Sequence, residues 1–277
     1  MPEAVSRLGR GRKSDRDWTD SPGGALPIQF NRMEVRRAAR SAPGYDVCMG
    51  SLIFITGTDT GVGKTVLTAM LLASLRADGV HALAMKPVCC GSRADARLID
   101  KIQEHEIPIE QVNPWYIPQP VAPAALPKHE RPNWRPSELE RSIRELQEGC
   151  EVLLVEGCGG VMVPLLENYF VRDLIEHLRC PVICAGRNRL GIINHMLLSA
   201  RCLGEAGICK RVYVLMGTKS RNLATRTNAN VLKCFLEPDP VVELPDLGGK
   251  ADEFAVIKKS AKRFKKTLAL IREMATF

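Results

Sequence analysis

The stretch GTDTGVGKT, residues 57–65, has the residue types of a loop that binds the phosphates of a nucleotide. It follows the apolar run SLIFIT and precedes a helix-forming segment, which is the context that such a loop requires. Gly61 and Gly63 let backbone N–H groups turn toward an anion, and the dipole of the following helix favours the same anion. Lys64 is suited to neutralise the outer phosphates, and Thr65 is suited to place its hydroxyl on magnesium.

The spacing of this loop is unusual. Five residues separate Gly57 from Gly63, whereas the common pattern has four between its first Gly and the Gly-Lys-Thr. A Gly-rich turn that binds nothing is the alternative interpretation. The position between a strand and a helix favours nucleotide binding, and the wider spacing indicates a particular kind of phosphate loop.

Three further residues that could do chemistry lie near the ends of predicted elements. The second strand ends in AMKPV, which places Lys86 beside the expected phosphates. The run EVLLVEGCGG places Glu156 at the carboxyl end of a buried strand, where a carboxylate can ligate magnesium. Asp95 is either the N-cap of the next helix or a third oxygen ligand for the same ion. We expect Lys86→Ala to spare the fold and to remove most of the rate.

Strand and helix patterns alternate along the chain. We predict strands at 51–56, 81–86, 151–156, 181–186, 211–216 and 241–244, and helices at 63–78, about 95–104, 136–148, 191–206 and 222–235. This alternation predicts an α/β fold with a mostly parallel sheet and helices on both faces, like that of the P-loop NTPases. Ligands of such sheets bind at the carboxyl ends of the strands.

The positive charge is concentrated at the two ends of the chain. The net charge of +8 arises from residues 1–48 and 250–277, because the middle is balanced. Residues 1–48 lack apolar periodicity and are predicted to be disordered or to be an over-called start before Met49. Residues 49–249 form the predicted P-loop α/β domain. Residues 250–277 are predicted to form a basic amphipathic helix that packs on the core, with a membrane-surface helix as the weaker alternative.

Composition excludes several classes of protein. A chain of 277 residues with 45% hydrophobic residues can bury one full core. No apolar run is long enough to span a bilayer and no signal peptide is present, so we expect a cytoplasmic protein without membrane partners. Neither basic end interleaves aromatic residues with its charges, so nucleic-acid binding is not expected. The ten cysteines lack zinc-site spacing and are expected to be reduced.

Together these residues resemble the dethiobiotin synthetase family, the ATP-dependent carboligases of biotin synthesis. FITGTDTGVGKT is similar to the family's phosphate loop, including its wider spacing. The strings MKPVCCGS, VNPW, LLVEGCGGVMVP, RLGIINHMLLSA and ELPDL match the family's later blocks in order. The likeness runs from about residue 51 to about residue 247.

The resemblance implies that 7,8-diaminononanoate is carbamylated by carbon dioxide, that ATP phosphorylates the carbamate, and that the second amine closes a ureido ring. It implies that Lys64 and Lys86 are catalytic. It implies a magnesium site made by Thr65, Asp95 and Glu156. It also implies a homodimer in which the helix start LGIINH receives the diamine's carboxylate from the neighbouring subunit.

The same resemblance implies two sets of binding residues. Those for ATP are Gly61, Val62, Gly63, Lys64, Thr65, Val66, Asp95, Glu156, Gly157, Cys158, Gly159 and Pro245. Those for the diamine are Thr60, Cys90, Gly159 and Asn194.

Two positions depart from the family pattern. Cys90 stands where the family usually has Ser, and a thiol donates a weaker hydrogen bond than a hydroxyl. Met216 stands where many members have an Asn that reads adenine, so the preferred nucleoside triphosphate stays open. Relatives that partition chromosomes carry a Lys at the position of Asp59 and are disfavoured. A nucleotide-binding regulatory protein with a decayed synthetase site remains the alternative, and turnover discriminates between the two.

Overall fold

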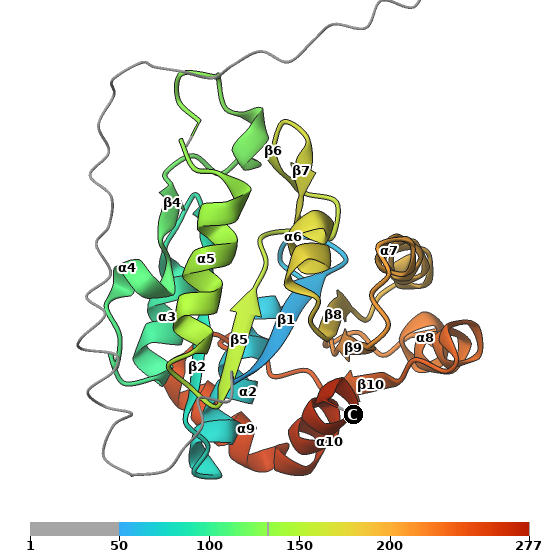
Figure 1. Ribbon diagram of the computed structural model, residues 1–277. Helices are drawn as coiled ribbons and strands as arrows, with labels where there is room; N and C mark the ends of the chain where they lie inside the picture. Colours follow the sequence, from blue (N-terminus) through green and yellow to red (C-terminus); the bar gives the residue numbers. More distant parts are fainter. Residues whose placement is uncertain (1–49, 132, 277) are drawn as a thin grey trace, which may run out of the picture. The chain divides into compact units, whose positions relative to one another are not determined.

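The computed structural model describes residues 50–276, apart from residue 132. Its centre is a six-stranded sheet in the order β10-β9-β8-β1-β5-β2, in which every neighbouring pair is parallel (Figure 1). The strands are β1 (Ser51–Gly57), β2 (Ala82–Met85), β5 (Val152–Glu156), β8 (Val182–Arg187), β9 (Arg211–Met216) and β10 (Val241–Leu244). All six predicted strands and the predicted fold class are therefore confirmed. The predictions for residues 1–48 lie outside the described residues.

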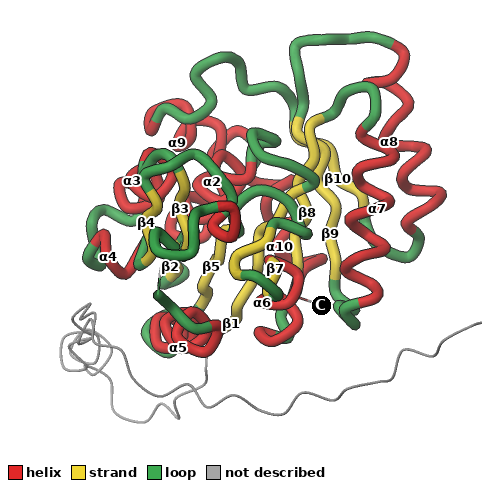
Figure 2. Tube along the Cα trace, turned by 90° about the horizontal axis from the view of Figure 1, so that it is seen from above, coloured by secondary structure: helices red, strands yellow, loops and turns green. Residues whose placement is uncertain are grey.

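Helices cover both faces of this sheet. The five predicted helices are present, each with ends within two residues of the prediction: α2 (Lys64–Ala77), α3 (Ala94–Ile102), α5 (Pro136–Gln147), α7 (Ile192–Glu205) and α8 (Leu223–Leu236). Figure 2 shows α2 on one side of the strands and α5 on the other. Because both faces are covered, the strands are apolar on both faces and do not alternate with polar residues. Phe54 in β1 and Val155 in β5, for example, are fully buried.

Several short elements of the structure were not predicted from the sequence. Helix α6 (Val171–Leu178) forms the crossover between β5 and β8, and a crossover is required because parallel strands cannot be joined by a tight turn. Its buried side chains, Val171, Leu174, Ile175 and Leu178, have helical spacing, but the helix has only eight residues. The other unpredicted elements are α4 (Ile109–Val112), β3 (Val88–Cys90), β4 (Trp115–Ile117), β6 (Pro164–Leu166), β7 (Tyr169–Phe170) and a 3-10 turn, η1 (Pro123–Ala125).

The C-terminal stripe forms two helices where the sequence predicts one. These are α9 (Phe254–Arg263) and α10 (Lys265–Thr276), which are separated at Phe264. Both contact α2, and their buried residues include Ile257, Ala261, Leu268 and Ile271. The Nζ atom of Lys265 also lies 2.5 Å from Asp78 at the end of α2. The bend at Phe264 lets both halves of the stripe face the core. Within residues 50–276, no helix is long and apolar enough to cross a membrane.

Truncating a buried residue of α9 tests this packing. Ile257→Ala is expected to lower the free energy of unfolding by about 2–5 kcal/mol, because Ile257 is fully buried beside α2. Lys259→Ala, an exposed control in the same helix, is expected to change it by no more than about 0.5 kcal/mol. Urea unfolding measures both. Equal and small effects for the two variants would contradict the packing of α9 on the core.

Candidate functional site

The phosphate-loop motif forms the connection between β1 and α2. Gly61 and Gly63 have φ values of 70° and 103°, in the left-handed region that glycine adopts without strain. Gly63 is the N-cap of α2, and no side chain caps this end of the helix. The backbone N–H groups of the first turn are thus available to an anion, and the helix dipole favours it. The loop has the backbone geometry of an anion site.

Lys64 is the first residue of α2 and is buried. Its Nζ donates a hydrogen bond to the backbone oxygen of Asp59 at 2.8 Å, which keeps the ammonium inside the loop. Burial lowers the pKa of Lys64, while the nearby carboxylate of Glu156 acts in the opposite direction. An anionic ligand beside Lys64 would supply the charge that the loop itself lacks.

Lys86, at the end of β2, forms a buried ion pair with Glu156, at the end of β5. Its Nζ lies 2.7 Å from Glu156 Oε1 and also pairs with Asp95, in the first turn of α3. Thr65 Oγ1 donates to the same Glu156 Oε1 at 2.7 Å. Burial alone would lower the pKa of Lys86, but Glu156 and Asp95 outweigh it and raise the pKa above its ordinary value. Lys86 therefore stays protonated. The structure brings these four predicted residues into one cluster.

The oxygen atoms of this cluster suit magnesium. Glu156 is fully buried, and its Oε2 has no hydrogen-bond partner. Asp95 and the hydroxyl of Thr65 lie around the same ammonium and carboxylate. Magnesium prefers oxygen ligands, and in phosphoryl-transfer sites it takes one or two carboxylates plus phosphate oxygens and water. The described residues contain no group of three His, Cys, Asp or Glu side chains that could hold a metal by themselves. A nucleotide would have to complete this site.

Asn113, which the sequence analysis did not assign a role, anchors the segment that carries Lys86. It is fully buried, and its Nδ2 donates to the backbone oxygens of Lys86 at 2.9 Å, Pro87 at 3.2 Å and Trp115 at 3.1 Å. The backbone N–H of Lys86 in turn donates to Val112 O at 2.8 Å. The available signal was the string VNPW, in which a polar residue stands between Val112 and Pro114.

Two of the residues assigned to the diamine lie next to each other. A Cβ added to Gly159 would be 3.4 Å from Thr60 Oγ1, so the Gly-rich turn after β5 faces the phosphate loop. Cys90 ends β3 and is partly buried, and burial raises the pKa of its thiol to about 11. Burial raises the pKa of the neighbouring Cys158 thiol to about 12. Both thiols are neutral at physiological pH and are poor nucleophiles.

The other predicted binding residues have varied positions. Val62 is buried against the Gly57 backbone, Val66 is partly buried in α2, and Gly157 approaches the ring of Phe54. Pro245 directly follows β10, at the carboxyl edge of the sheet. Asn194 is exposed in the first turn of α7, and no contact is described between it and the Lys86 cluster. The structure of a single chain thus leaves Asn194 outside the cluster.

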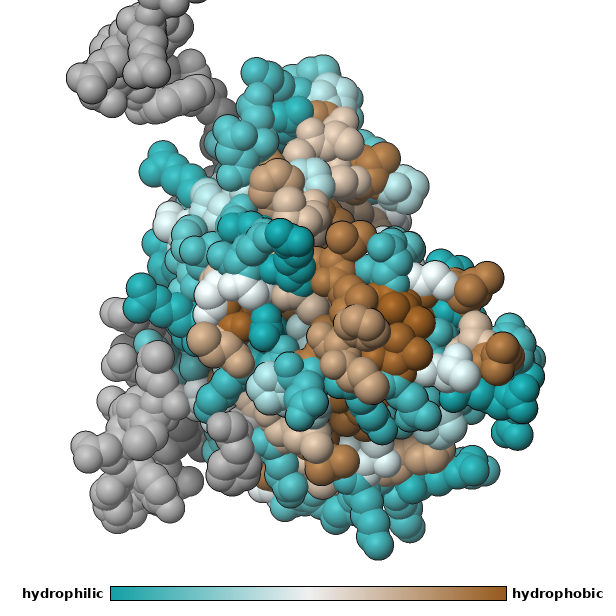
Figure 3. Space-filling view, turned by 90° about the vertical axis from the view of Figure 1, so that its right-hand side faces the viewer, coloured by the Kyte–Doolittle hydropathy of each residue, from teal (hydrophilic) through white to brown (hydrophobic). Residues whose placement is uncertain are grey.

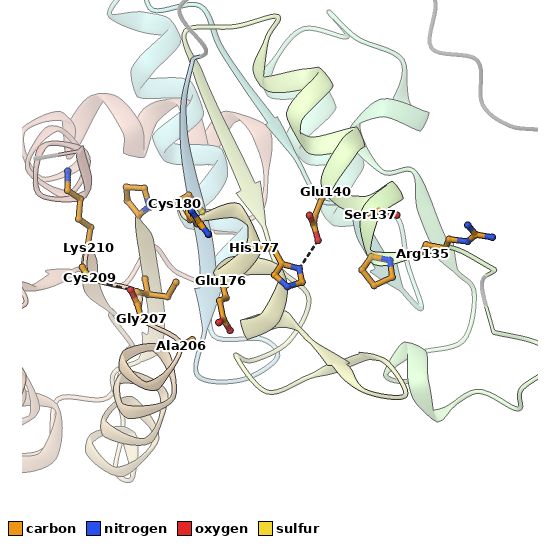
Figure 4. A pocket seen from close by; sticks show the side chains of 14 residues that line it. Arg135, Ser137, Glu140, Glu176, His177, Cys180, Ala206, Gly207, Cys209 and Lys210 are labelled. Atoms are coloured by element: carbon orange, nitrogen blue, oxygen red, sulfur yellow. Dashed lines mark hydrogen bonds and ion pairs between the residues drawn. The ribbon is translucent and has the colours of Figure 1, made fainter. Parts of the chain in front are cut away.

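A separate groove lies away from this cluster. It has a volume of about 1190 Å³ and includes residues 206–210, which precede β9, and Cys180 and Pro181, which precede β8. Its lining is mixed in charge, and His177 Nδ1 lies 2.7 Å from Glu140 Oε1 within it (Figure 4). Because residues that precede parallel strands lie at the amino edge of the sheet, this groove is not the site that the phosphate loop forms.

Removing the ammonium of Lys86 tests the cluster's energetics. Lys86→Ala is expected to lower the free energy of unfolding by about 3–5 kcal/mol, because Glu156 would be left buried without its counter-ion. This replaces the expectation that the substitution spares the fold. Adding Glu156→Gln should recover most of the loss, as measured by urea unfolding.

The matched control for that measurement is Lys64→Ala. Lys64 is similarly buried, but its described hydrogen bond is to a backbone carbonyl, so its removal should cost less. The Lys86→Ala variant could instead have the same free energy of unfolding as Lys64→Ala, with no recovery when Glu156→Gln is added. That result would show that the Lys86–Glu156 pair does not balance a buried charge.

Comparisons with solved structures agree with the fold. The Pyrococcus furiosus cell division ATPase MinD has a TM-score of 0.54 at 16% identity, over 82% of this chain and 100% of that chain. The septum site-determining protein MinD from Pyrococcus horikoshii, complexed with Mg-ADP, has a TM-score of 0.53 at 15% identity, over 82% and 98%. At these identities the likeness shows the shared fold alone.

Comparisons of sequence go further. A family model described as an AAA domain matches residues 51–245. The ATP-dependent dethiobiotin synthetase BioD of Bacillus licheniformis is 35% identical over 188 residues, covering 66% of this chain and 80% of that protein. The enzyme of the same name from Thermodesulfovibrio yellowstonii is 34% identical, covering 70% and 86%. The one from Akkermansia muciniphila is 33% identical, covering 69% and 90%. With its AAA domain and its phosphate-loop cluster, the chain belongs to the family of ATP-dependent dethiobiotin synthetases.

Proposed function

We propose that this protein is a ligase of biotin biosynthesis that converts 7,8-diaminononanoate, CO₂ and ATP to dethiobiotin. The observation that carries the proposal is the buried Lys86–Glu156 pair beside the phosphate loop, with Thr65 and Asp95 around it. A regulatory protein with a decayed site has no need of two buried ammonium groups and a buried carboxylate at the loop. The named relatives do not favour that alternative.

The reaction creates negative charge at each stage. One amine attacks CO₂ and loses a proton, which gives a carbamate. A carbamate oxygen then attacks the outer phosphorus of ATP and ADP leaves, which gives a mixed anhydride. The second amine attacks the carbonyl carbon, and phosphate leaves as the ureido ring closes. Positive groups positioned before the reaction stabilise such charge most effectively.

Lys64 and Lys86 supply those positive groups in this proposal. Lys86 is held charged by two carboxylates, so it can face the carbamate and the transferred phosphoryl group without giving up its proton. Lys64, whose bond to Asp59 O is local, can turn to the phosphates. Thr65, Asp95 and Glu156 would hold magnesium, which would neutralise phosphate oxygens when bound.

The diamine is proposed to lie between the phosphate loop and the turn after β5. Thr60 and Gly159 face each other there, and Cys90 ends the nearby strand β3. With a pKa of about 11, the Cys90 thiol is neutral and offers only a weak S–H donor. The diamine's second end is proposed to be held by another subunit.

That second subunit is proposed to dock on the side of the molecule where α7 lies. Figure 3 views this side and shows a contiguous hydrophobic patch. Leu190, Leu198 and Met162 are among the exposed large hydrophobic residues, at 83%, 59% and 51% exposure. Contiguous exposed apolar surface of this kind marks protein interfaces. In a homodimer, Asn194 at the first turn of α7 would reach the partner's diamine site.

The proposed location is the cytoplasm. The described cysteines are free, and several of them are buried in the core. Free thiols are the usual state in a reducing compartment.

The direct test of the function is phosphate release from ATP with magnesium and ¹³C-bicarbonate, with and without 7,8-diaminononanoate. We expect release that depends on the diamine, and a product that carries one ¹³C atom per diamine by mass spectrometry. A monoamine of the same chain length should give no ring-closed product. Phosphate release at the same rate with and without the diamine, and no labelled product, would contradict the proposal.

The role of Lys86 is best measured in a stable background. Lys86→Ala combined with Glu156→Gln is expected to lower kcat by at least about 100-fold, because charge stabilisation by one positioned group typically contributes that much. Glu156→Gln alone is the comparison. A rate for the double variant within a few-fold of Glu156→Gln alone would remove Lys86 from the proposed catalytic groups.

The dimer is tested by a charge introduced on α7. Leu198→Glu is expected to convert the dimer to a monomer in analytical ultracentrifugation, because a carboxylate cannot be buried there without a partner. Leu223→Glu on α8, a residue that is equally apolar and 70% exposed, is the control and should leave the dimer intact. A wild-type protein that sediments as a monomer would refute this arrangement.

A further inference from the structure

The sheet order places the nucleoside on a definite side of the phosphate loop. Glu156, which ends β5, and Lys86, which directly follows β2, lie on one side of β1, and β8, β9 and β10 lie on the other. The outer phosphate must lie at the Lys86 cluster, because it is the group transferred in the proposed function. The rest of the nucleotide then extends away from β5 and β2. The base therefore faces the carboxyl ends of β8, β9 and β10.

Met216 presents a nonpolar side chain at that place. It is the last residue of β9, and its side chain is nearly buried. A Cβ added to Gly63 would lie 3.1 Å from Met216 Cε, so the thioether packs directly on the phosphate loop. A thioether has no N–H or O–H donor and is a weak acceptor. Pro245, which follows the neighbouring strand β10, has no backbone N–H either.

The side-chain amides near these strand ends are already in use. Asn188, which follows β8, donates through Nδ2 to Thr225 O at 2.9 Å, and its Oδ1 accepts from Asn228 Nδ2 at 2.8 Å. Asn188 and Asn228 are both buried. Asn222 accepts from the backbone N–H of Thr225 at 3.0 Å and so caps α8. These bonds join the loops after β8 and β9 to α8. Each of these amides already makes hydrogen bonds within the protein, with which a base would have to compete.

We infer that the base is held mainly by nonpolar contact with Met216 and that no side-chain amide selects it. The enzyme therefore uses ATP, CTP, GTP and UTP with similar efficiency. The expected turnover of the four triphosphates rests on the proposed function, whereas their expected binding does not. An amide that pairs with adenine discriminates by roughly 5-fold to 150-fold, whereas a nonpolar surface discriminates weakly between flat rings. We expect the four Kd values, and the four kcat/KM values, to agree within about tenfold.

The experiment measures binding and turnover separately. Competition against a fluorescent nucleoside triphosphate, with magnesium and without the diamine, gives Kd for the four triphosphates. Phosphate release with the diamine and bicarbonate gives the four kcat/KM values. Met216→Asn adds an amide that can pair with adenine. It should raise the ratio of kcat/KM for ATP to kcat/KM for CTP by about fivefold or more. Met216→Leu keeps a nonpolar side chain and should leave that ratio unchanged.

Each outcome bears on one claim. Wild-type protein that binds any one triphosphate more than about tenfold more tightly than the other three overturns the inference, since a nonpolar surface discriminates only weakly between flat rings. Binding of all four without diamine-dependent release supports the inference and defeats the proposed function. Binding of none defeats both. If Met216→Asn does not fold, as judged by thermal unfolding, the wild-type ranking decides alone.

Discussion

The buried charge of Glu156 constrains how the other residues of the site are arranged. A carboxylate that is fully buried at the end of β5 destabilises the fold unless a positive group and hydrogen-bond donors balance it. Lys86 supplies the charge from the adjacent strand β2, and Thr65 supplies a hydroxyl from α2. The three residues come from distant parts of the chain. Their meeting requires that β1, β5 and β2 be neighbours in the sheet.

The same constraint explains how the site is prepared for its ligands. Glu156 uses one carboxylate oxygen on Lys86 and Thr65, and leaves Oε2 without a partner. An unpartnered buried oxygen is costly, and a metal ion is one group that can satisfy it. Burial lowers the pKa of Lys64, although the Glu156 carboxylate acts in the opposite direction. Glu156 Oε2 could therefore accept a cation and the Lys64 ammonium could pair with an anion, and we propose that magnesium and a triphosphate would fill these two places.

The sequence predicts the fold well where the physical signal is local. The six strands are continuous apolar runs, and Gly63 and Lys64 are recognisable because the loop needs those residue types in order. Helix α6 was missed because eight residues give little periodicity, and the C-terminal stripe was predicted as one helix because its spacing hides the bend at Phe264. The Lys86–Glu156 pair was not predictable as an ion pair, because it depends on which strands are adjacent. Asn113 was missed because its partners are backbone oxygens.

A crystal structure with magnesium and a nonhydrolysable ATP analogue would show directly whether Lys86 holds the transferred phosphate. We expect the outer phosphate to contact Lys86 Nζ and magnesium to be held among Thr65, Asp95 and Glu156. We also expect the base to lie over Met216. An outer phosphate on the β8 side of the loop, with Lys86 still paired only with its carboxylates, would contradict the proposed role of Lys86 in phosphoryl transfer.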